Sequence, residues 1–463
     1  MVLRKNIALG CALSICTLVC STAYGAYANN LNSYSLADDD THEVGRPVKG
    51  YIGGLYNGLT SEVSQVDGNR YNVDFEFDYF KKKPDELERR LTFAARLNDE
   101  NLTMYSVQEA YINHKWGRSE LIFGRQILDW SIVDGAWGFG KLNNRRNFDF
   151  FVPGQEGLIG VQFRRRYSNG LRYHFFVSPI YVPETNPGLD IDKGDKTIKS
   201  RNPWGNPPAE TAEIPTGGGT NRTSKIEYIV DYPEINEVIW RPGAGFNIGW
   251  ESTYWMLDAF FMRKPENSPT TKVEVSIPPA GEIRANITPE FYYHDLYGGN
   301  IRYRNKDLEI YFSGLAIRPN TFPDGNSEAL QYTEIKTAKI REDYVGGGIT
   351  QSNDRFVMGL SYVARLSPFN RNTDNLAQEP RWNQAGNGFL TWNFGRSFSI
   401  QFNGKYDMFT RDRLFMVKAL YNVSRALQLN AGVNLIGTPP DGKSFWSPYT
   451  NNDAAYAGLR YLF

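Results

Sequence analysis

Apolar and polar residues alternate with a period of two through several segments of about ten residues each. Because successive side chains of a strand point to opposite faces, each such segment is predicted to be a β-strand with one apolar and one polar face. Strands of a soluble sandwich usually have about five or six residues, whereas a strand that crosses a bilayer needs roughly nine to eleven. The length of these runs therefore favours a membrane barrel. The clearest runs are 72–79, 91–98, 398–408 and 427–435.

The complete pattern predicts an all-β fold, namely a transmembrane antiparallel up-and-down β-barrel. About eighteen strands are expected, within a range of roughly sixteen to twenty. A hairpin inside 183–239 or 265–295 would raise the number to about twenty. The expected strand centres lie near residues 55, 75, 94, 110, 124, 162, 176, 246, 259, 301, 312, 346, 361, 389, 404, 417, 431 and 459.

Short and long connections alternate between these strands. The short ones, such as 305–307, are rich in Gly, Asn, Asp and Ser, as hairpin turns are. The long ones are typical of external loops, and an even number of strands places both termini in the periplasm. Segment 183–239, rich in Pro and Gly, is expected to be a long irregular external loop and a partial lid. Segments 319–340 and 367–382 are expected to be external as well.

The two ends of the chain point to export and membrane insertion. Arg4 and Lys5 precede a short apolar run that ends in an A-x-A pattern at Ala26–Ala28, so 1–28 is predicted to be a cleaved signal peptide. A short periplasmic segment, 29–46, would follow, and 47–463 would form the barrel. The last strand alternates and ends on Phe463. This ending resembles the closing strand of bacterial outer-membrane β-barrels, a resemblance that implies recognition of Phe463 by the barrel-assembly machinery.

Composition narrows the alternatives further. All three cysteines lie in the predicted signal peptide, so the mature chain has neither disulfides nor thiolate metal sites. The chain has 51 basic and 51 acidic residues, and loss of Arg4 and Lys5 leaves 51 − 2 = 49 basic ones. This balance gives no indication of binding to nucleic acid. The mean hydropathy of −0.48 excludes a helical membrane protein.

Segment 131–156 follows the fifth predicted strand and is rich in aromatic residues and arginine. The run Gly-Arg-Gln at 124–126 and the run Asn-Arg-Arg-Asn-Phe-Asp at 144–149 are similar to a stretch in porin-like and alginate-export-type outer-membrane channels. The resemblance implies that 131–156 folds into the pore. Its aromatic side chains would otherwise leave a large exposed apolar patch. We therefore expect Arg145, Arg146 and Asp149 to line a constriction and the two arginines to face lumen acids such as Asp74 and Asp78.

The polar faces of the predicted strands supply further candidate pore-lining residues. Opposed cations and acids would orient polar solutes by a transverse field, whereas charges that pair between neighbouring strands would only solvate the wall. Adjacent arginine pairs at 164/166 and 302/304 favour anions over cations. The basic candidates are Arg96, Arg164, Arg166, Arg302, Arg304, Lys405 and Arg460. The acidic candidates are Asp74, Glu76, Asp78 and Asp407.

The sequence thus predicts an outer-membrane porin that passively conducts small hydrophilic solutes. A substrate-specific channel for anionic saccharides or polysaccharide export, and a closed barrel with adhesive loops, are the alternatives. An enzyme is disfavoured, because the chain has four histidines and the one adjacent pair, His294 and Asp295, would point to opposite faces of a strand. No cofactor or metal is expected. The expected partners are outer-membrane lipid and lipopolysaccharide, the solutes, and a homo-oligomer of this chain.

Overall fold

The computed structural model describes residues 48–463 except 60–68, 82–86, 98–102, 148–149, 152–153, 187–188, 193, 201, 206, 216–220, 279–280, 321–326, 330–331, 337–339, 368–378, 396 and 441–443. The predicted signal peptide 1–28 and the segment 29–46 lie outside the described residues, and so does the candidate Asp149.

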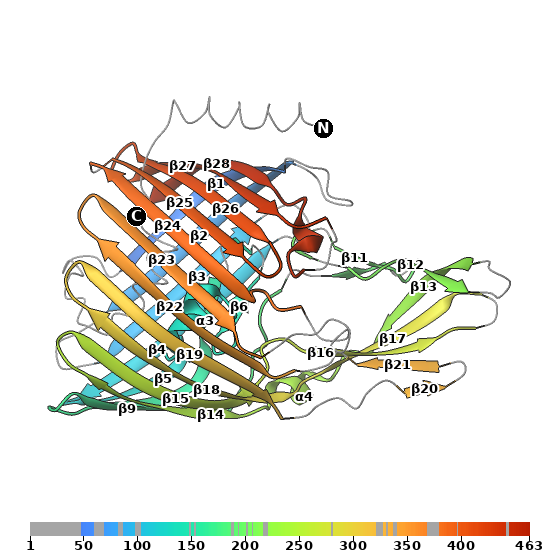
Figure 1. Ribbon diagram of the computed structural model, residues 1–463, viewed down its shortest axis with the longest axis horizontal. Helices are drawn as coiled ribbons and strands as arrows, with labels where there is room; N and C mark the ends of the chain where they lie inside the picture. The colour runs from blue at the N-terminus through green and yellow to red at the C-terminus, as the bar shows by residue number, and fades with distance from the viewer. Residues whose placement is uncertain are drawn as a thin grey trace.

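Eighteen antiparallel strands form a single closed barrel (Figure 1). The ring closes where β1 pairs with β28 as well as with β2, with Ile52 opposite Tyr461. Every predicted strand centre falls within one of these strands, so the predicted fold is confirmed. The strands are β1 (Val48–Leu59), β2 (Asn69–Lys81), β3 (Glu88–Leu97), β4 (Met104–Trp116), β5 (Ser119–Gln126), β8 (Leu158–Arg166), β9 (Leu171–Ser178), β14 (Gly243–Glu251), β15 (Trp255–Pro265), β18 (Tyr293–Arg304), β19 (Leu308–Pro319), β22 (Glu342–Ser352), β23 (Phe356–Arg365), β24 (Gln384–Phe394), β25 (Phe398–Asp407), β26 (Arg413–Asn422), β27 (Leu427–Gly437) and β28 (Ala454–Leu462).

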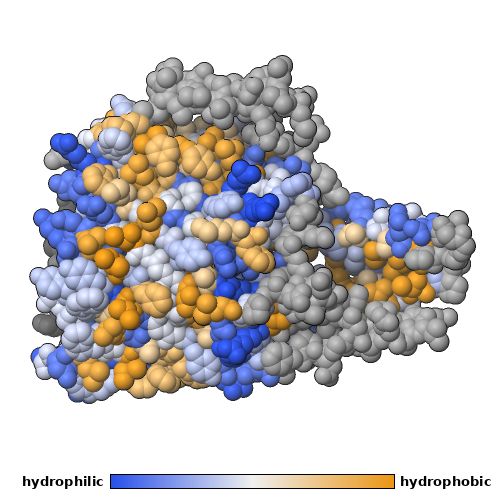
Figure 2. Space-filling model, viewed as in Figure 1, coloured by the Kyte–Doolittle hydropathy of each residue, from blue (hydrophilic) through white to orange (hydrophobic). Residues whose placement is uncertain are grey.

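The outer face of the barrel is largely apolar and the inner face is largely polar. Phe123, Phe312 and Leu360 are exposed on the outside, and Figure 2 shows apolar side chains spread over the barrel wall. Inward positions of the same strands carry polar residues such as Asn300 and Ser313. This arrangement follows from the period-two pattern, because lipid selects apolar side chains outside and water selects polar ones inside.

No helix among the described residues is both long and apolar enough to cross a membrane.

The long connections on one rim build a second sheet instead of an irregular loop. It has six strands and projects from the barrel on the side away from the C-terminus (Figure 1). Its strands come from three different connections, and β13 and β17 pair in parallel. In sheet order they are β12 (Thr211–Pro215), β13 (Asn221–Val230), β17 (Ile283–Glu290), β16 (Thr270–Ser276), β21 (Tyr332–Lys336) and β20 (Ser327–Ala329). Segments 183–239 and 265–295 thus do contain strands, but these pair outside the barrel, which keeps its eighteen strands.

The hairpin turns at 117–118, 305–307, 353–355 and 423–426 lie on the opposite rim, together with Phe463 (Figure 1). Gly117, Gly170 and Gly395 occupy such turns with φ of 59°, 88° and 73°, values that favour glycine. Exposed aromatic residues follow this rim as a girdle, which suits a membrane–water interface. They are Trp116, Trp250, Trp255, Trp392, Tyr421 and Tyr461.

The orientation of the barrel can be tested by single-cysteine labelling, because the predicted mature chain has no cysteine of its own. We expect Asp195→Cys, in the connection that leads to the external sheet, to react with a membrane-impermeant maleimide on intact cells. Lys306→Cys, in a tight turn, should react only after the outer membrane is permeabilised. The opposite labelling pattern would show that the external sheet faces the periplasm.

Candidate pore constriction

After β5 the chain turns into the barrel as an inward segment, residues 127–143. Its short helix α3 (Ile132–Trp137) begins at Ser131, whose hydroxyl accepts a hydrogen bond from the Asp134 backbone N–H. The first N–H groups of the helix donate to side chains on the inner faces of β18 and β19: Ile132 to Asn300 at 3.1 Å and Val133 to Ser313 at 3.2 Å. These bonds satisfy donors that the start of any helix leaves open, and they fix α3 to the barrel wall.

A buried carboxylate holds the remainder of the inward segment in shape. The two oxygens of Asp134 accept hydrogen bonds from the backbone N–H groups of Lys141 and Leu142, each at 2.9 Å. Lys141 also pairs with Glu342 on β22 at 2.7 Å. Burial acts to lower the pKa of Lys141, but the negative charge of Glu342 raises it above its ordinary value, so the lysine remains charged.

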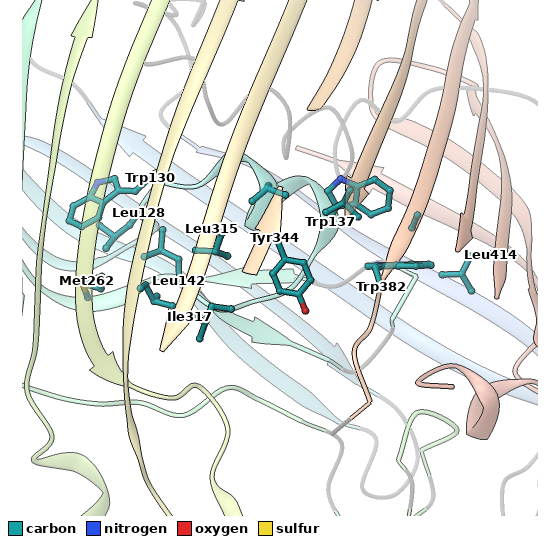
Figure 3. Close-up of a cluster of buried hydrophobic side chains, with 14 of the residues drawn as sticks. Leu128, Trp130, Trp137, Leu142, Met262, Leu315, Ile317, Tyr344, Trp382 and Leu414 are labelled. Carbon is teal, nitrogen blue, oxygen red and sulfur yellow. The ribbon is translucent and has the colours of Figure 1, made fainter. Parts of the chain in front are cut away.

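Aromatic side chains pack the inward segment against one side of the barrel (Figure 3). Trp137 meets Trp382 edge-on at 6.0 Å between ring centroids, and Trp382 lies 5.3 Å from Trp446. Phe139 stacks on Tyr344 of β22 at 4.2 Å. Together with inward aliphatic side chains of β15 to β27, these rings form a buried apolar cluster inside the barrel. The space left for solvent is therefore expected along the opposite wall, formed by β28 and β1 to β4.

The two predicted constriction arginines have different environments. Both belong to β6 (Asn144–Arg146), which pairs with β7 (Gly154–Glu156). Arg145 is only 2% exposed, and its side chain lies against Gly138 and Gly140, where a Cβ atom would overlap it. Arg145 is therefore a packing residue of the turn after α3 and does not line open water.

Arg146 is closer to the open wall. Burial lowers the pKa of its guanidinium, and the positive charge of Arg96 acts in the same direction. Glu156 and Glu76 oppose that shift. Since these residues lie on β3, β7 and β2, their charges surround Arg146 from the wall and from the inward side. Arg146 is thus the better candidate of the two for a pore-lining cation.

The acids that we expected to face these arginines are engaged by residues of β3. Asp74 accepts a hydrogen bond from Arg96 Nε at 2.8 Å, and Asp78 accepts one from the Thr92 hydroxyl at 3.0 Å. Arg90 lies 3.7 Å from Asp78 and 3.1 Å from Glu109 of β4. The side chains of Arg90 and Arg96 are nevertheless 37% and 26% exposed, so water reaches this wall.

Several other predicted lumen charges are paired between strands. Arg166 lies 3.0 Å from Glu251, and Arg304 lies 3.8 Å from Glu309. Arg302 is buried on the inner face of β18, with its guanidinium 3.3 Å from the sulfur of Met256. All of these arginines lie on the inner wall. Of the two predicted pairs, 164/166 and 302/304, one arginine in each, Arg166 and Arg304, is neutralised by a carboxylate.

Asp407 serves a different purpose from the one expected. Its carboxylate accepts hydrogen bonds from the backbone N–H groups of Asn383, Phe409 and Thr410 at 2.6, 2.8 and 3.0 Å. It is only 1% exposed. Asp407 therefore stabilises the turn after β25, and its charge is compensated by backbone donors.

Among the inner-wall cations that make no ion pair with a described residue are Arg164, Lys405, Lys418 and Arg460. Arg164 donates to the Gln162 side chain at 2.8 Å. Lys405 lies 5.5 Å from the ring centroid of Trp137, and Arg460 lies 4.3 Å from that of Tyr51. Tyr51 thus faces the lumen.

Sequence reasoning overlooked three charged residues of this region: Arg90, Glu109 and Asp129. The alternation in β3 and β4 could have identified Arg90 and Glu109, because both lie on polar faces. Asp129 lies in an irregular stretch with no periodic signal.

His294, the histidine of the one adjacent pair, is buried on the inner face, whereas Asp295 lies on the outer face. Because they lie on opposite faces of β18, the two side chains cannot form the hydrogen bond that a catalytic pair requires.

Comparisons with known proteins find similar chains among solved structures, at low sequence identity and low structural overlap. No family model and no curated protein matches the chain. A mutant of the Rhodopseudomonas blastica porin matches with 9% identity and a TM-score of 0.36, over 90% of this chain and 99% of the porin. Pseudomonas aeruginosa OccK11 (OpdR) matches with 11% identity and a TM-score of 0.45, over 90% of this chain and 95% of that one. What this chain does must therefore be argued from its own residues.

By its own features the chain is a transmembrane β-barrel. The closed ring, the exposed apolar outer face, the polar inner face and the aromatic girdle together suit a bilayer outside and water inside.

Asp134→Asn tests whether the buried carboxylate holds the inward segment in place. An amide offers one acceptor where the carboxylate offers two, so one backbone N–H loses its partner at a cost on the order of 1–3 kcal/mol. We expect a folded barrel with noisier and larger single-channel currents. Asp354→Asn, in an exposed turn, is the matched control and should behave as wild type. Quiet, unchanged currents in Asp134→Asn would show that Asp134 does not hold the segment.

Proposed function

We propose that this protein is an outer-membrane channel for the passive diffusion of small hydrophilic solutes. The observation that carries the proposal is the asymmetry of the interior. Apolar packing occupies the side of β15 to β27, while the side of β1 to β4 keeps charged side chains in contact with water. A barrel of about 16 to 18 strands is wide enough to leave an aqueous channel when its side chains do not fill it.

The proposed path runs between the inward segment and the wall of β28 and β1 to β3. Arg146 would line it from the inward side, and Arg96, Glu76, Tyr51 and Arg460 would line it from the wall. Charges of both signs border this path, so a passing dipolar solute would be oriented by a transverse field. An apolar solute would have to displace the water that solvates these charges.

The charge balance of the inner wall supports a weak preference for anions. Arg164, Lys405, Lys418 and Arg460 have no ion-pair partner among the described residues. The acid Glu76, which faces the lumen, also has no ion-pair partner among the described residues. The charge of Asp407 is compensated by backbone N–H groups. The excess is small, because Arg96, Arg166 and Arg304 are neutralised by carboxylates.

The membrane environment supplies the proposed partners. Outer-membrane lipid and lipopolysaccharide would cover the apolar outer face, which could also contact a second copy of this chain. Phe463 lies at the closing seam, where its backbone exchanges hydrogen bonds with Gly50 at 3.1 and 3.2 Å, and we propose that the assembly machinery reads it.

The external sheet keeps one alternative open, namely a barrel that serves surface contact. Its six strands present a platform away from the membrane, as an adhesive module would. Single-channel recording separates the two functions, because a closed adhesive barrel would give no current.

Shortening the inward segment tests its role as a constriction. We expect replacement of 132–142 by a short Gly/Ser linker to raise the single-channel conductance roughly twofold or more, because the segment occupies part of the lumen. The control is an equal deletion in the β12–β13 hairpin of the external sheet, which should leave conductance unchanged. An unaltered conductance in the first variant would mean that the segment does not limit flow.

Reversal potentials across a salt gradient test the anion preference. Removing two unpaired cations in Arg164→Gln with Arg460→Gln should lower the anion-to-cation permeability ratio by roughly two- to fivefold, and more strongly at low salt. Lys306→Gln removes a cation from an exposed turn and should have a much smaller effect. A wild-type channel that prefers cations, or a double variant identical to wild type, would refute the proposed preference.

A further inference from the structure

Asp129 occupies an unusual position on the inward segment. The residues on both sides of it are tied to distant strands: Ile127 N–H donates to Glu109 on β4 at 3.2 Å, and the carbonyl of Trp130 accepts from Asn300 on β18 at 2.9 Å. Between β4 and β18 the barrel wall contains five other strands. Asp129 therefore lies in a stretch that crosses a wide part of the inner wall.

The charges nearest to Asp129 come from four strands of the barrel, β3, β4, β8 and β18. Arg90 on β3, Arg164 on β8 and Arg302 on β18 lie near enough to attract its carboxylate, and Glu109 on β4 lies near enough to repel it. Asp129 itself makes no hydrogen bond or ion pair with a described residue. Its negative charge is thus stabilised by the nearby arginines without a direct hydrogen bond or ion pair to any of them.

We propose that Asp129 is a selectivity-determining countercharge whose protonation switches the channel from weak to stronger anion preference. The proposal rests on the proposed channel function and deepens it. When the carboxylate is ionised, it offsets part of the positive potential of Arg90, Arg164 and Arg302. When the carboxyl is protonated, the positive potential of those arginines is no longer offset, and it attracts passing anions more strongly.

The acidity of this carboxyl agrees with the proposed switch. Burial raises the pKa of Asp129 to about 7, Glu109 adds to the rise, and the three arginines oppose it. A raised pKa means that the carboxyl is ionised above neutral pH and gains its proton as the pH falls through about 7. The lumen therefore becomes more positive on the acidic side, and anion preference is expected to increase there.

The test is the reversal potential of the full-length channel in a planar bilayer under a potassium chloride gradient, at about pH 5.5 and about pH 8.5. For a single charge near the ion path, we expect the chloride-to-potassium permeability ratio to rise roughly two- to fivefold from the higher pH to the lower one. Asp129→Asn should show the high ratio at both pH values. Asp129→Glu, which keeps the carboxylate, should retain the pH dependence.

Asp307→Asn is the matched control, because it removes an exposed turn carboxylate and should leave the pH dependence intact. The outcome that overturns the proposal is a pH dependence that survives in Asp129→Asn, since another titratable group would then carry it. A wild-type ratio that does not change with pH overturns it as well. Absence of any current in the wild type would instead refute the channel function itself.

Discussion

The rest of the structure depends on the closure of the backbone hydrogen-bond ladder between β1 and β28. In hydrocarbon an unpaired N–H or C=O group costs several kcal/mol, so a sheet can cross a bilayer only if it has no free edge. Gly50 lies at this seam, and a side chain there would overlap the carbonyl of Glu76 and the ring of Phe463. The Phe463 ring in turn stacks on Phe75 at 6.3 Å, outside the barrel. Closure therefore involves the first and the last strand of the chain, with glycine making room for the terminal aromatic ring.

Once the ring is closed, its width becomes the next constraint. A lumen of eighteen strands cannot be filled by wall side chains alone. The inward segment supplies the missing volume on one side, where Trp137, Trp382 and Trp446 pack against each other. Arg381 adds to this packing by lying 5.1 Å from the Trp446 ring centroid and donating to the carbonyls of Gly138 and Phe150. The result is an interior that is tightly packed with apolar side chains on one side and has exposed charged side chains on the other.

The charges inside the barrel are arranged to limit the cost of burial. A charge removed from water is costly unless it is paired or hydrogen-bonded, and Arg172 and Asp134 meet this requirement. Arg172 pairs with Asp258 at 3.1 Å, and Asp134 binds two backbone N–H groups. Charges that remain exposed to the lumen are under less constraint, and there the pairing is incomplete. This difference explains how one wall can contain both structural ion pairs and cations that are free to act on solutes.

The sequence by itself determined the barrel, its strands and the face of each side chain, because period-two alternation is a local property imposed by lipid on one side and water on the other. Arg164, Arg302 and Arg460 could be placed on the inner face for that reason. Only the tertiary structure decided which charges meet. Whether Asp74 binds Arg96 or Arg146, and whether Asp407 faces water or a turn, depends on strand register and on the path of the inward segment. The tertiary structure also decided the external sheet, because its strands come from three separate connections and find their partners only in the folded protein. Asp129 could not be identified from the sequence for the same reason: its environment is assembled from β3, β4, β8 and β18, which range over residues 88–304 of the chain.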